Sequence, residues 1–317
     1  MKAVHLAACL TRAGRINGLA IDHGRSLDAA IQSARGGQTL DGDALQFKQC
    51  VASVLGRHAS LTLVDPTCGP LIAQSPDRPP CLIYGYEQDV YSKDVATLVP
   101  DMPPDWSVRR LAAIGARAIK LYLPFDPESA PTLDRRRKVM VERIGAECAT
   151  IGLPFFLEPV TSTNDPAQRP HDVLRAVQEF GQAHYHVDVL KIELPVQARL
   201  IGQCYSRALA ADALRRVADA TSLPLVYLSG GVPFDALVDG LDFAAASGAR
   251  FNGVLCGRSL WTGGIPAFAR HGVAGLNDWL LHHALPNLQR LGRTVDLQAS
   301  ACLPGLAAQR DAVAAVA

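Results

Sequence analysis

The chain has 317 residues, of which 49% are hydrophobic and 19% are charged, and its formal net charge is +1. This composition predicts a soluble globular protein, with room for one large α/β domain or two smaller ones. The nearly neutral charge removes the attraction that nucleic acid or an anionic membrane would require, so we expect neither as a partner. Because the sequence has no signal-peptide pattern and no membrane-spanning stretch, we expect a cytoplasmic location.

The basic run and the cysteines are weaker signals. The run from Arg135 to Lys138 is most simply a solvated helix face. The eight cysteines are scattered and form no Cys-x-x-Cys pair, and several lie in apolar runs. This pattern is typical of reduced, buried thiols rather than of a disulfide framework or a zinc site.

Eight short apolar segments predict strands, because most follow a turn residue, are rich in Val, Ile, Leu and Phe, and end in polar residues, Gly or Pro. In chain order they are GLAIDH at 18–23, LTLVDP at 61–66, CLIYGYE at 81–87, AIKLYLP at 118–124, PFFLEPV at 154–160, VLKIELP at 189–195, PLVYLSGG at 224–231 and FNGVLCGR at 251–258.

Stretches with helical periodicity lie between these segments, at 105–115, 136–151, 172–180, 208–220 and 234–247, and a closing helix is predicted at 279–291. The alternation predicts a single (β/α)₈ barrel over 1–317, with a short N-terminal extension to about 17 and a C-terminal helical tail from about 292. A doubly wound open sheet is the alternative, but the Gly-rich phosphate fingerprint that it often carries is absent after the first strand.

Polar side chains gather late in the predicted strands, where a barrel has its active site. Every strand contributes to this set, which comprises Asp22, Asp65, Glu87, Lys120, Glu158, Lys191, Glu193, Ser229 and Arg258.

Lys120 and Lys191 are the most informative members of this set. Their apolar neighbours on both sides would pack against the helices, so the period of two turns both lysines into the barrel. A structural interpretation needs buried ion pairs, with Lys191 bound to Glu158 and Lys120 to Asp22 or Glu193. In the catalytic interpretation, burial beside a second cation favours a neutral amine that forms a Schiff base with a carbonyl, while Glu158 moves protons.

The ends of the seventh and eighth segments suggest a phosphate site. Ser229, Gly230 and Gly231 end one strand, and Gly257 and Arg258 end the next. Barrels commonly bind phosphate at this place through backbone amides, and an arginine adds a forked donor. The alternative is that the glycines serve ordinary turns.

The histidines do not predict a metal centre. His184 and His186 precede their strand, at the end opposite to the expected active site, so we interpret them as structural or exposed. His23 lies late on the first strand and either contacts substrate or forms a hydrogen-bonding wall. We therefore expect no metal and no cofactor.

Several motifs resemble one family over about 18–285. They are FFLEPV, HVDVLKIELPV, YLSGGV and FNGVLCGRSLW, with DWSVRRL and ERIGAEC between earlier strands. They are similar to the class I, Schiff-base tagatose 1,6-bisphosphate aldolases and the related sulfofructose phosphate aldolases. The resemblance implies that Lys191 forms the Schiff base and that Glu158 transfers protons. It also implies that Lys120 positions the substrate and favours the neutral amine of Lys191.

The same resemblance implies that Ser229 and Arg258 contact a substrate phosphate and that Asp22 is the aspartate ending the first strand. In the family that aspartate is commonly followed by Gln-Arg, whereas this chain reads Asp22-His23-Gly24-Arg25. Asp-His-Gly is closer to aldolases resembling archaeal fructose bisphosphate aldolase. This difference from the family's sequence affects the expected recognition of the distal end of the sugar.

The sequence therefore predicts an aldolase that reversibly cleaves a ketose phosphate. The expected substrate is tagatose 1,6-bisphosphate, which gives dihydroxyacetone phosphate and glyceraldehyde 3-phosphate. The alternatives are an aldolase for fructose bisphosphate or for a sulfo- or deoxy-ketose phosphate, and a non-catalytic barrel that binds sugar phosphates and regulates a partner. A homo-oligomer is compatible with the sequence, which leaves the number of subunits open.

Overall fold

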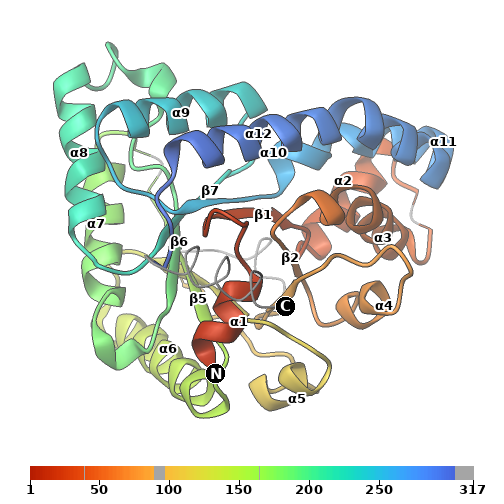
Figure 1. Ribbon diagram of the computed structural model, residues 1–317, viewed down its shortest axis with the longest axis horizontal. Helices are drawn as coiled ribbons and strands as arrows, with labels where there is room; N and C mark the ends of the chain where they lie inside the picture. Colours follow the sequence, from red (N-terminus) through yellow and green to blue (C-terminus); the bar gives the residue numbers. More distant parts are fainter. Residues whose placement is uncertain (39, 89–96, 164, 304–317) are drawn as a thin grey trace, which may run out of the picture.

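The computed structural model describes residues 1–38, 40–88, 97–163 and 165–303. Eight parallel strands pair in chain order and β8 pairs with β1, which closes a barrel (Figure 1). The predicted (β/α)₈ fold is confirmed, and an open doubly wound sheet is excluded. The strands are β1 (Ile16–Ala20), β2 (Leu61–Val64), β3 (Leu82–Gly85), β4 (Ile119–Phe125), β5 (Phe155–Thr161), β6 (Val189–Ile192), β7 (Leu225–Leu228) and β8 (Gly253–Cys256).

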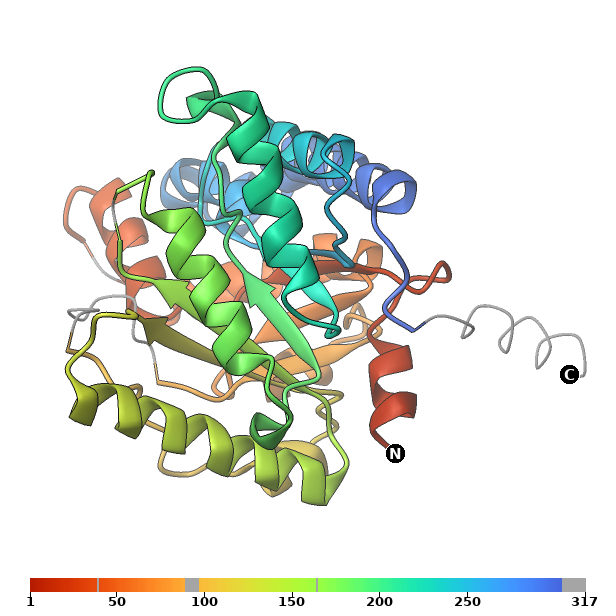
Figure 2. The ribbon, with the colours of Figure 1, turned by 90° about the vertical axis from the view of Figure 1, so that its left-hand side faces the viewer.

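Helices surround the barrel, as Figures 1 and 2 show from two sides. They are α1 (Lys2–Ala8), α2 (Arg25–Ala34), α3 (Asp43–Leu55), α4 (Gly69–Ala73), α5 (Val108–Ala113), α6 (Pro131–Ile151), α7 (Arg169–Phe180), α8 (Arg207–Asp219), α9 (Phe234–Ala246), α10 (Arg258–Trp261), α11 (Ile265–Trp279) and α12 (Leu285–Gln298). A π-helical turn, Leu280–Ala284, joins the last two. Short 3₁₀ turns lie at Gly56–His58, Ala183–Tyr185, Ala198–Leu200 and Thr262–Gly264.

The elements differ from the predictions at several places. The helices α2, α3, α4 and α11 were not predicted, and α6 begins at Pro131 rather than at 136. The first strand ends at Ala20, so Asp22 and His23 lie in the loop that follows it. The predicted closing helix at 279–291 corresponds to the π-helical turn and the first part of α12, which continues to Gln298. The part of the predicted tail from 304 onward lies outside the described residues. The predicted N-terminal extension contains α1, and β1 already begins at Ile16.

Two apolar clusters show which way the strand side chains point. Ala118, Phe156 and Val189 belong to a cluster that fills the barrel interior, whereas Ile119 and Leu190 belong to the larger cluster between the strands and the helices. Because side chains alternate along a strand, the residues two positions after the first three also face the interior. The prediction that the lysines at 120 and 191 point inward is confirmed, and Glu158 shares that direction.

The barrel closes between β8 and β1 through a very close backbone approach. Gly253 pairs with Ile16 in the ladder and has a φ of +144°, in the range that favours glycine. A Cβ at this position would lie 1.9 Å from the Ile16 carbonyl oxygen. Only glycine therefore allows the last strand to reach the first without displacing its backbone.

The short helix α1 covers the N-terminal end of the barrel (Figure 2). Leu6, Cys9 and Leu10 pack into the interior cluster from this end. Lys2 Nζ lies 2.7 Å from Asp188 Oδ2, which ties the start of α1 to the residue before β6. Apolar packing thus seals this end, and the charged interior residues lie toward the other.

Two predictions about surface residues need correction. Arg137, in the basic run, is buried rather than solvated, because its guanidinium donates to the Leu98 carbonyl at 2.9 Å and to the Ser129 hydroxyl at 3.0 Å. All eight cysteines are free thiols and seven are buried, but Cys204 is exposed, since it lies on the loop before α8. Among the described residues, no helix has the length and apolar character needed to cross a membrane.

Candidate active site

Glu158 lies between the two interior lysines at the C-terminal end of the barrel. Its Oε1 is 2.8 Å from Lys191 Nζ, and its Oε2 is 2.8 Å from Lys120 Nζ. All three side chains are buried, and Lys120 has no exposed surface. One carboxylate therefore links the two ammonium groups, which brings together the three residues that the sequence predicted as catalytic.

Lys120 has two further carboxylate partners. Asp22 Oδ2 accepts a hydrogen bond from its ammonium at 3.0 Å, and Glu87 Oε1 accepts one at 2.5 Å. The Asp22 contact was one of the two partners that the sequence suggested. Glu87 is a late-strand polar residue that does not belong to the predicted site, and its place at the end of the third apolar segment is the signal that points to it. Three carboxylates thus surround one buried lysine.

The three carboxylates differ in their titration. Burial raises the pKa of Glu158, but Lys120 and Lys191 outweigh it, and the pKa lies below its ordinary value. Burial also raises the pKa of Asp22, yet Lys120 and then His23 bring it well below its usual range. Glu87 behaves in the opposite way, because burial raises its pKa more than Lys120 lowers it. Among these three groups, Glu87 is therefore the one whose pKa is shifted upward.

His23 is buried beside this cluster. Its ring meets the Trp261 ring edge-on at 5.1 Å between centroids, and its Nδ1 lies 3.6 Å from Asp22 Oδ1. Burial lowers the pKa of His23 to about 4 against the opposing effect of Asp22, and Arg258 lowers it further. At neutral pH this ring is uncharged, so it contributes a neutral hydrogen-bonding side chain to the site rather than a cation.

A cavity of about 170 Å³ opens directly onto Lys191 and Glu158. Predicted site residues from the ends of five strands line it together, namely His23, Glu158, Lys191, Ser229, Gly230, Gly257 and Arg258. Asp22 and Lys120 do not line this cavity; Lys120 lies behind Glu158 and contacts Asp22. The arrangement brings a primary amine, a carboxylate and a forked cation to one small space.

The predicted phosphate residues meet between β7 and β8. The Gly257 backbone N–H donates to Ser229 Oγ at 3.5 Å, and Arg258 opens the short helix α10. A Cβ on Gly257 would lie 2.8 Å from the Ala20 carbonyl oxygen, so this position requires glycine for its close approach to β1. Gly231 has a φ of +76° and faces Arg258. These backbone positions can approach an anion closely.

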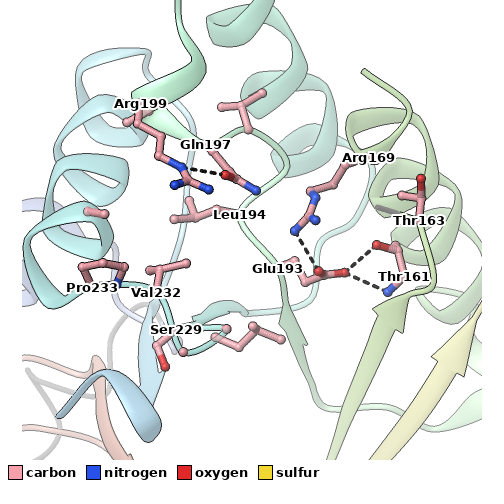
Figure 3. A pocket seen from close by; sticks show the side chains of 16 residues that line it. Thr161, Thr163, Arg169, Glu193, Leu194, Gln197, Arg199, Ser229, Val232 and Pro233 are labelled. Carbon is pink, nitrogen blue, oxygen red and sulfur yellow. Dashed lines mark hydrogen bonds and ion pairs between the residues drawn. The ribbon is translucent and has the colours of Figure 1, made fainter. Parts of the chain in front are cut away.

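A second cavity, of about 500 Å³, adjoins the first and shares Glu193, Leu228, Ser229 and Gly230 with it (Figure 3). Gly231 lines this cavity rather than the smaller one. Arg169 and Arg199 also line it, and Arg199 Nε donates to Gln197 Oε1 at 3.1 Å. Neither arginine was predicted as a site residue.

Glu193 does not pair with Lys120, for which the sequence suggested it as a possible partner. Its Oε2 accepts hydrogen bonds from the backbone N–H and the hydroxyl of Thr161, both at 2.7 Å. Its Oε1 lies 3.1 Å from an Arg169 guanidinium nitrogen (Figure 3). The reason is distance along the strand: Lys120 already has three carboxylate partners deeper in the barrel, whereas Glu193 lies past the end of β6, level with the β5 terminus.

Asp65, the late-strand residue of β2, has a structural partner. Lys48 from α3 lies 2.6 Å from it and is itself buried. Burial lowers the pKa of Lys48, but Asp65 outweighs this and the pKa is raised. Burial raises the pKa of Asp65, and Lys48 again outweighs it. This pair is charged and mutually neutralised, and it lies outside the smaller cavity.

The histidine pair lies away from these groups. His184 belongs to the 3₁₀ turn that precedes β6, at the opposite end of that strand from the cavities, and its ring lies against Tyr185. In the described part of the chain, no group of three or more His, Cys, Asp or Glu side chains has an arrangement that could hold a metal ion.

A family model described as DeoC/LacD family aldolase matches residues 17–263. Tagatose 1,6-diphosphate aldolase 2 of Enterococcus faecalis is 35% identical over 305 residues, which cover 92% of this chain and 92% of that protein. Tagatose 1,6-diphosphate aldolase of Streptococcus pneumoniae is 32% identical over 314 residues, which cover 94% of this chain and 96% of that one.

Solved structures share the fold at low sequence identity. Fructose-bisphosphate aldolase from Plasmodium falciparum has a TM-score of 0.68 at 14% identity and covers 94% of this chain and 96% of its own. An archaeal fructose 1,6-bisphosphate aldolase has a TM-score of 0.61 at 13% identity and covers 92% and 98%. These structures support the barrel, while the family match and the relatives above 30% identity span most of its length. The chain therefore belongs to the DeoC/LacD family of aldolases.

Proposed function

We propose that this aldolase acts in the cytoplasm through a Schiff base on Lys191 and reversibly cleaves tagatose 1,6-bisphosphate to dihydroxyacetone phosphate and glyceraldehyde 3-phosphate. The observation that supports this most is the carboxylate of Glu158, which lies 2.8 Å from Lys191 Nζ and 2.8 Å from Lys120 Nζ beside the small cavity. A buried amine with an adjacent proton acceptor is what iminium chemistry requires.

In the first step, the Lys191 ammonium passes a proton to Glu158, and the neutral amine attacks the ketone carbon C2. The C2–N bond forms, the carbonyl electron pair moves to oxygen, and a proton passes from the new nitrogen cation to that oxygen, which gives a neutral carbinolamine. Glu158 then returns a proton to the carbinolamine hydroxyl, which leaves as water. The product is a protonated iminium, which can accept an electron pair from the neighbouring C3–C4 bond.

In the second step, Glu158 removes the proton of the C4 hydroxyl. The C3–C4 bond breaks, its electron pair moves through C3 toward the iminium nitrogen, and the aldehyde leaves. Protonation of the resulting enamine at C3 and addition of water then release the ketone and restore Lys191. Throughout, the ammonium of Lys120 would remain held by Asp22 and Glu87, where its charge favours the carboxylate form of Glu158.

The substrate's C1 phosphate is proposed to lie at the β7 and β8 ends. Ser229 supplies a hydroxyl, Gly230, Gly231 and Gly257 allow backbone amides to approach, and Arg258 supplies a forked guanidinium. This places the phosphate on the same cavity as Lys191, which orients the ketone carbon toward the amine.

Tagatose 1,6-bisphosphate is the first candidate because the relatives with 31–35% identity carry that sugar in their names. Fructose 1,6-bisphosphate is the second candidate, because His23 and Gly24 follow Asp22 where the tagatose enzymes commonly have Gln-Arg. The two sugars differ only in the configuration of one hydroxyl at C4. A comparison of kcat/KM across a panel of ketose bisphosphates, including sulfo- and deoxy-ketose phosphates, would rank them.

Borohydride trapping tests the chemistry. Incubation with dihydroxyacetone phosphate and sodium borohydride should attach the reduced substrate to Lys191, detected by peptide mass spectrometry, and Lys191→Met should lose both the adduct and cleavage activity. A chelator should leave activity unchanged. Full activity in Lys191→Met, or loss of activity with the chelator, would overturn the proposal.

A further inference from the structure

The backbone ladder between β5 and β6 ends just before the reactive side chains. These strands pair only at Phe156 with Val189 and at Leu157 with Leu190, whereas β4 pairs with β5 along its whole length. The next residues toward the barrel mouth are Glu158 and Lys191. Neither Glu158 nor Lys191 is itself a paired residue of the β5–β6 ladder, and no further pair follows toward the barrel mouth.

Proline explains why the ladder ends there. The Asp188 N–H donates to the Phe155 carbonyl at 2.9 Å, so Phe155 directs its backbone groups toward β6. Backbone groups alternate in direction along a strand, which means that Pro159 and Thr161 face the same way. Pro159 has no N–H to donate. The first residue beyond it that can donate toward β6 is Thr161.

Thr161 donates to a side chain instead of a strand carbonyl. Both its backbone N–H and its hydroxyl donate to Glu193 Oε2 at 2.7 Å, and Arg169 binds the other carboxylate oxygen (Figure 3). Glu193 is only 9% exposed, so its charge is compensated by these three donors rather than by water. The carboxylate of Glu193 thus replaces the missing ladder contact.

The position of Glu193 links this contact to the lysine. It lies two residues after Lys191, on the same side of the strand, and it lines both the small cavity and its larger neighbour. Each of its two oxygens already accepts a donor from β5 or α7. Both oxygens of Glu193 therefore serve to connect β6 with β5 and α7. Because each oxygen already accepts a hydrogen bond, we do not assign proton transfer to this carboxylate.

We propose that Glu193 is a positioning residue that holds the ends of β5 and β6 at the spacing at which Glu158 meets Lys191. This inference rests on the proposed function, because it concerns the rate at which that pair forms the iminium. Rates of this kind are sensitive to displacements of about 1 Å, which can cost about a hundredfold.

The test measures iminium formation at saturating dihydroxyacetone phosphate, as the rate of borohydride-trappable adduct. Glu193→Ala should lower this rate about tenfold to a hundredfold, while inhibition by inorganic phosphate changes less than about threefold, since the phosphate residues are untouched. The pH at which the rate is half-maximal should shift, because the contact between Glu158 and Lys191 changes. A purely structural role would leave that pH unchanged.

Graded variants separate the parts of the contact. Thr161→Val keeps the backbone donor but removes the hydroxyl, so its loss should be smaller, and in the double variant the two losses should not add. Glu193→Gln keeps one acceptor for Thr161 and should recover part of the rate lost in Glu193→Ala. These two milder variants carry the test if Glu193→Ala does not fold. Lys138→Met is the control, because this α6 residue pairs with Asp134 and with Glu179 of α7 and lines neither cavity, and the variant should match the wild type.

The outcomes distinguish the two proposals. If the wild type forms no adduct, the proposed Schiff-base function fails whatever Glu193 does. If the wild type forms the adduct but the Glu193 and Thr161 variants form it at the same rate with the same pH dependence, the positioning role is overturned. A large weakening of phosphate inhibition with an unchanged rate would overturn it too, because Glu193 would then act on binding.

Discussion

Glu158 meets Lys191 at 2.8 Å across two strands that no longer pair at that level. The same carboxylate touches Lys120, so the buried charges form one connected group rather than separate pairs. Removal of any one member leaves another buried charge without a partner, and an unpaired buried charge costs several kcal/mol.

Removal of Lys120 should destabilise the fold strongly. Lys120→Met leaves the carboxylates of Asp22, Glu87 and Glu158 without their shared cation, and we expect a loss of about 3–5 kcal/mol in the free energy of unfolding at pH 7. Lys191→Met should cost less, because Glu158 keeps Lys120. Urea denaturation of both variants checks this order.

The deficit of Lys120→Met should shrink as the pH falls. Without the cation, the buried carboxyl groups of the variant gain protons at a higher pH when folded than when unfolded, so acid favours the folded variant relative to its value at pH 7. Lys138→Met, which removes two partly exposed ion pairs, with Asp134 and Glu179, provides the control and should stay within about 1 kcal/mol of the wild type. Equal losses in the two variants would contradict the interpretation.

His23 should make stability depend on pH between about 6.5 and 4. Its pKa is about 4 in the folded state against an ordinary 6.5, so the unfolded chain binds the proton first as the pH falls. Stability that is present above pH 6.5 is then lost progressively, by about 3 kcal/mol at pH 4. Urea denaturation at pH 7 and pH 5 should show a smaller difference for His23→Gln than for the wild type. The exposed His184→Gln variant should behave like the wild type.

Arg258 should contribute mainly to phosphate binding. Arg258→Met should raise the KM for a ketose bisphosphate about tenfold or more, because a charge-assisted forked contact is lost. The maximal rate of adduct formation should fall less, since Lys191 and Glu158 keep their contact. Inhibition by inorganic phosphate should weaken in parallel with the KM. A variant with unchanged phosphate inhibition would exclude the β7 and β8 ends as the phosphate site.

Barrel closure should tolerate no side chain at Gly253. In Gly253→Ala the added methyl group would meet the Ile16 carbonyl oxygen, and the φ of +144° adds strain, so we expect a loss above about 3 kcal/mol or failure to fold. Gly202→Ala is the matched control, because φ there is also positive but no atom lies within 4 Å of the added Cβ. It should cost about 1–2 kcal/mol.

The sequence predicted the residues whose positions follow from strand periodicity. Lys120, Glu158 and Lys191 each occupy an inward position of a short apolar strand, and inward positions of a closed barrel converge, so local pattern was sufficient. Glu87 obeys the same rule at the end of β3 but carried no further signal that would select it.

Residues held by contacts between distant segments could not be predicted in this way. Arg169 opens a helix and Lys48 lies within one, and neither position shows locally that a strand-end carboxylate lies opposite. Arg137 stands in a run of basic residues that looks solvated, and only its packing beneath the segment that contains Leu98 shows otherwise. Their roles depend on how helices dock on the barrel, which local periodicity does not determine.

The apolar cluster in the barrel interior, at the N-terminal end of the strands, has a consequence for engineering. The cluster that includes Leu61, Ile83, Phe156 and Val226 is sealed by α1 at the N-terminal end of the barrel. Ala20 and Leu255 of this cluster also line the smaller cavity, whereas its other described members line neither cavity. Substitutions that alter sugar preference can therefore be confined to the loops that follow the strands. A library of variants in these loops would leave the packing of this apolar cluster unchanged.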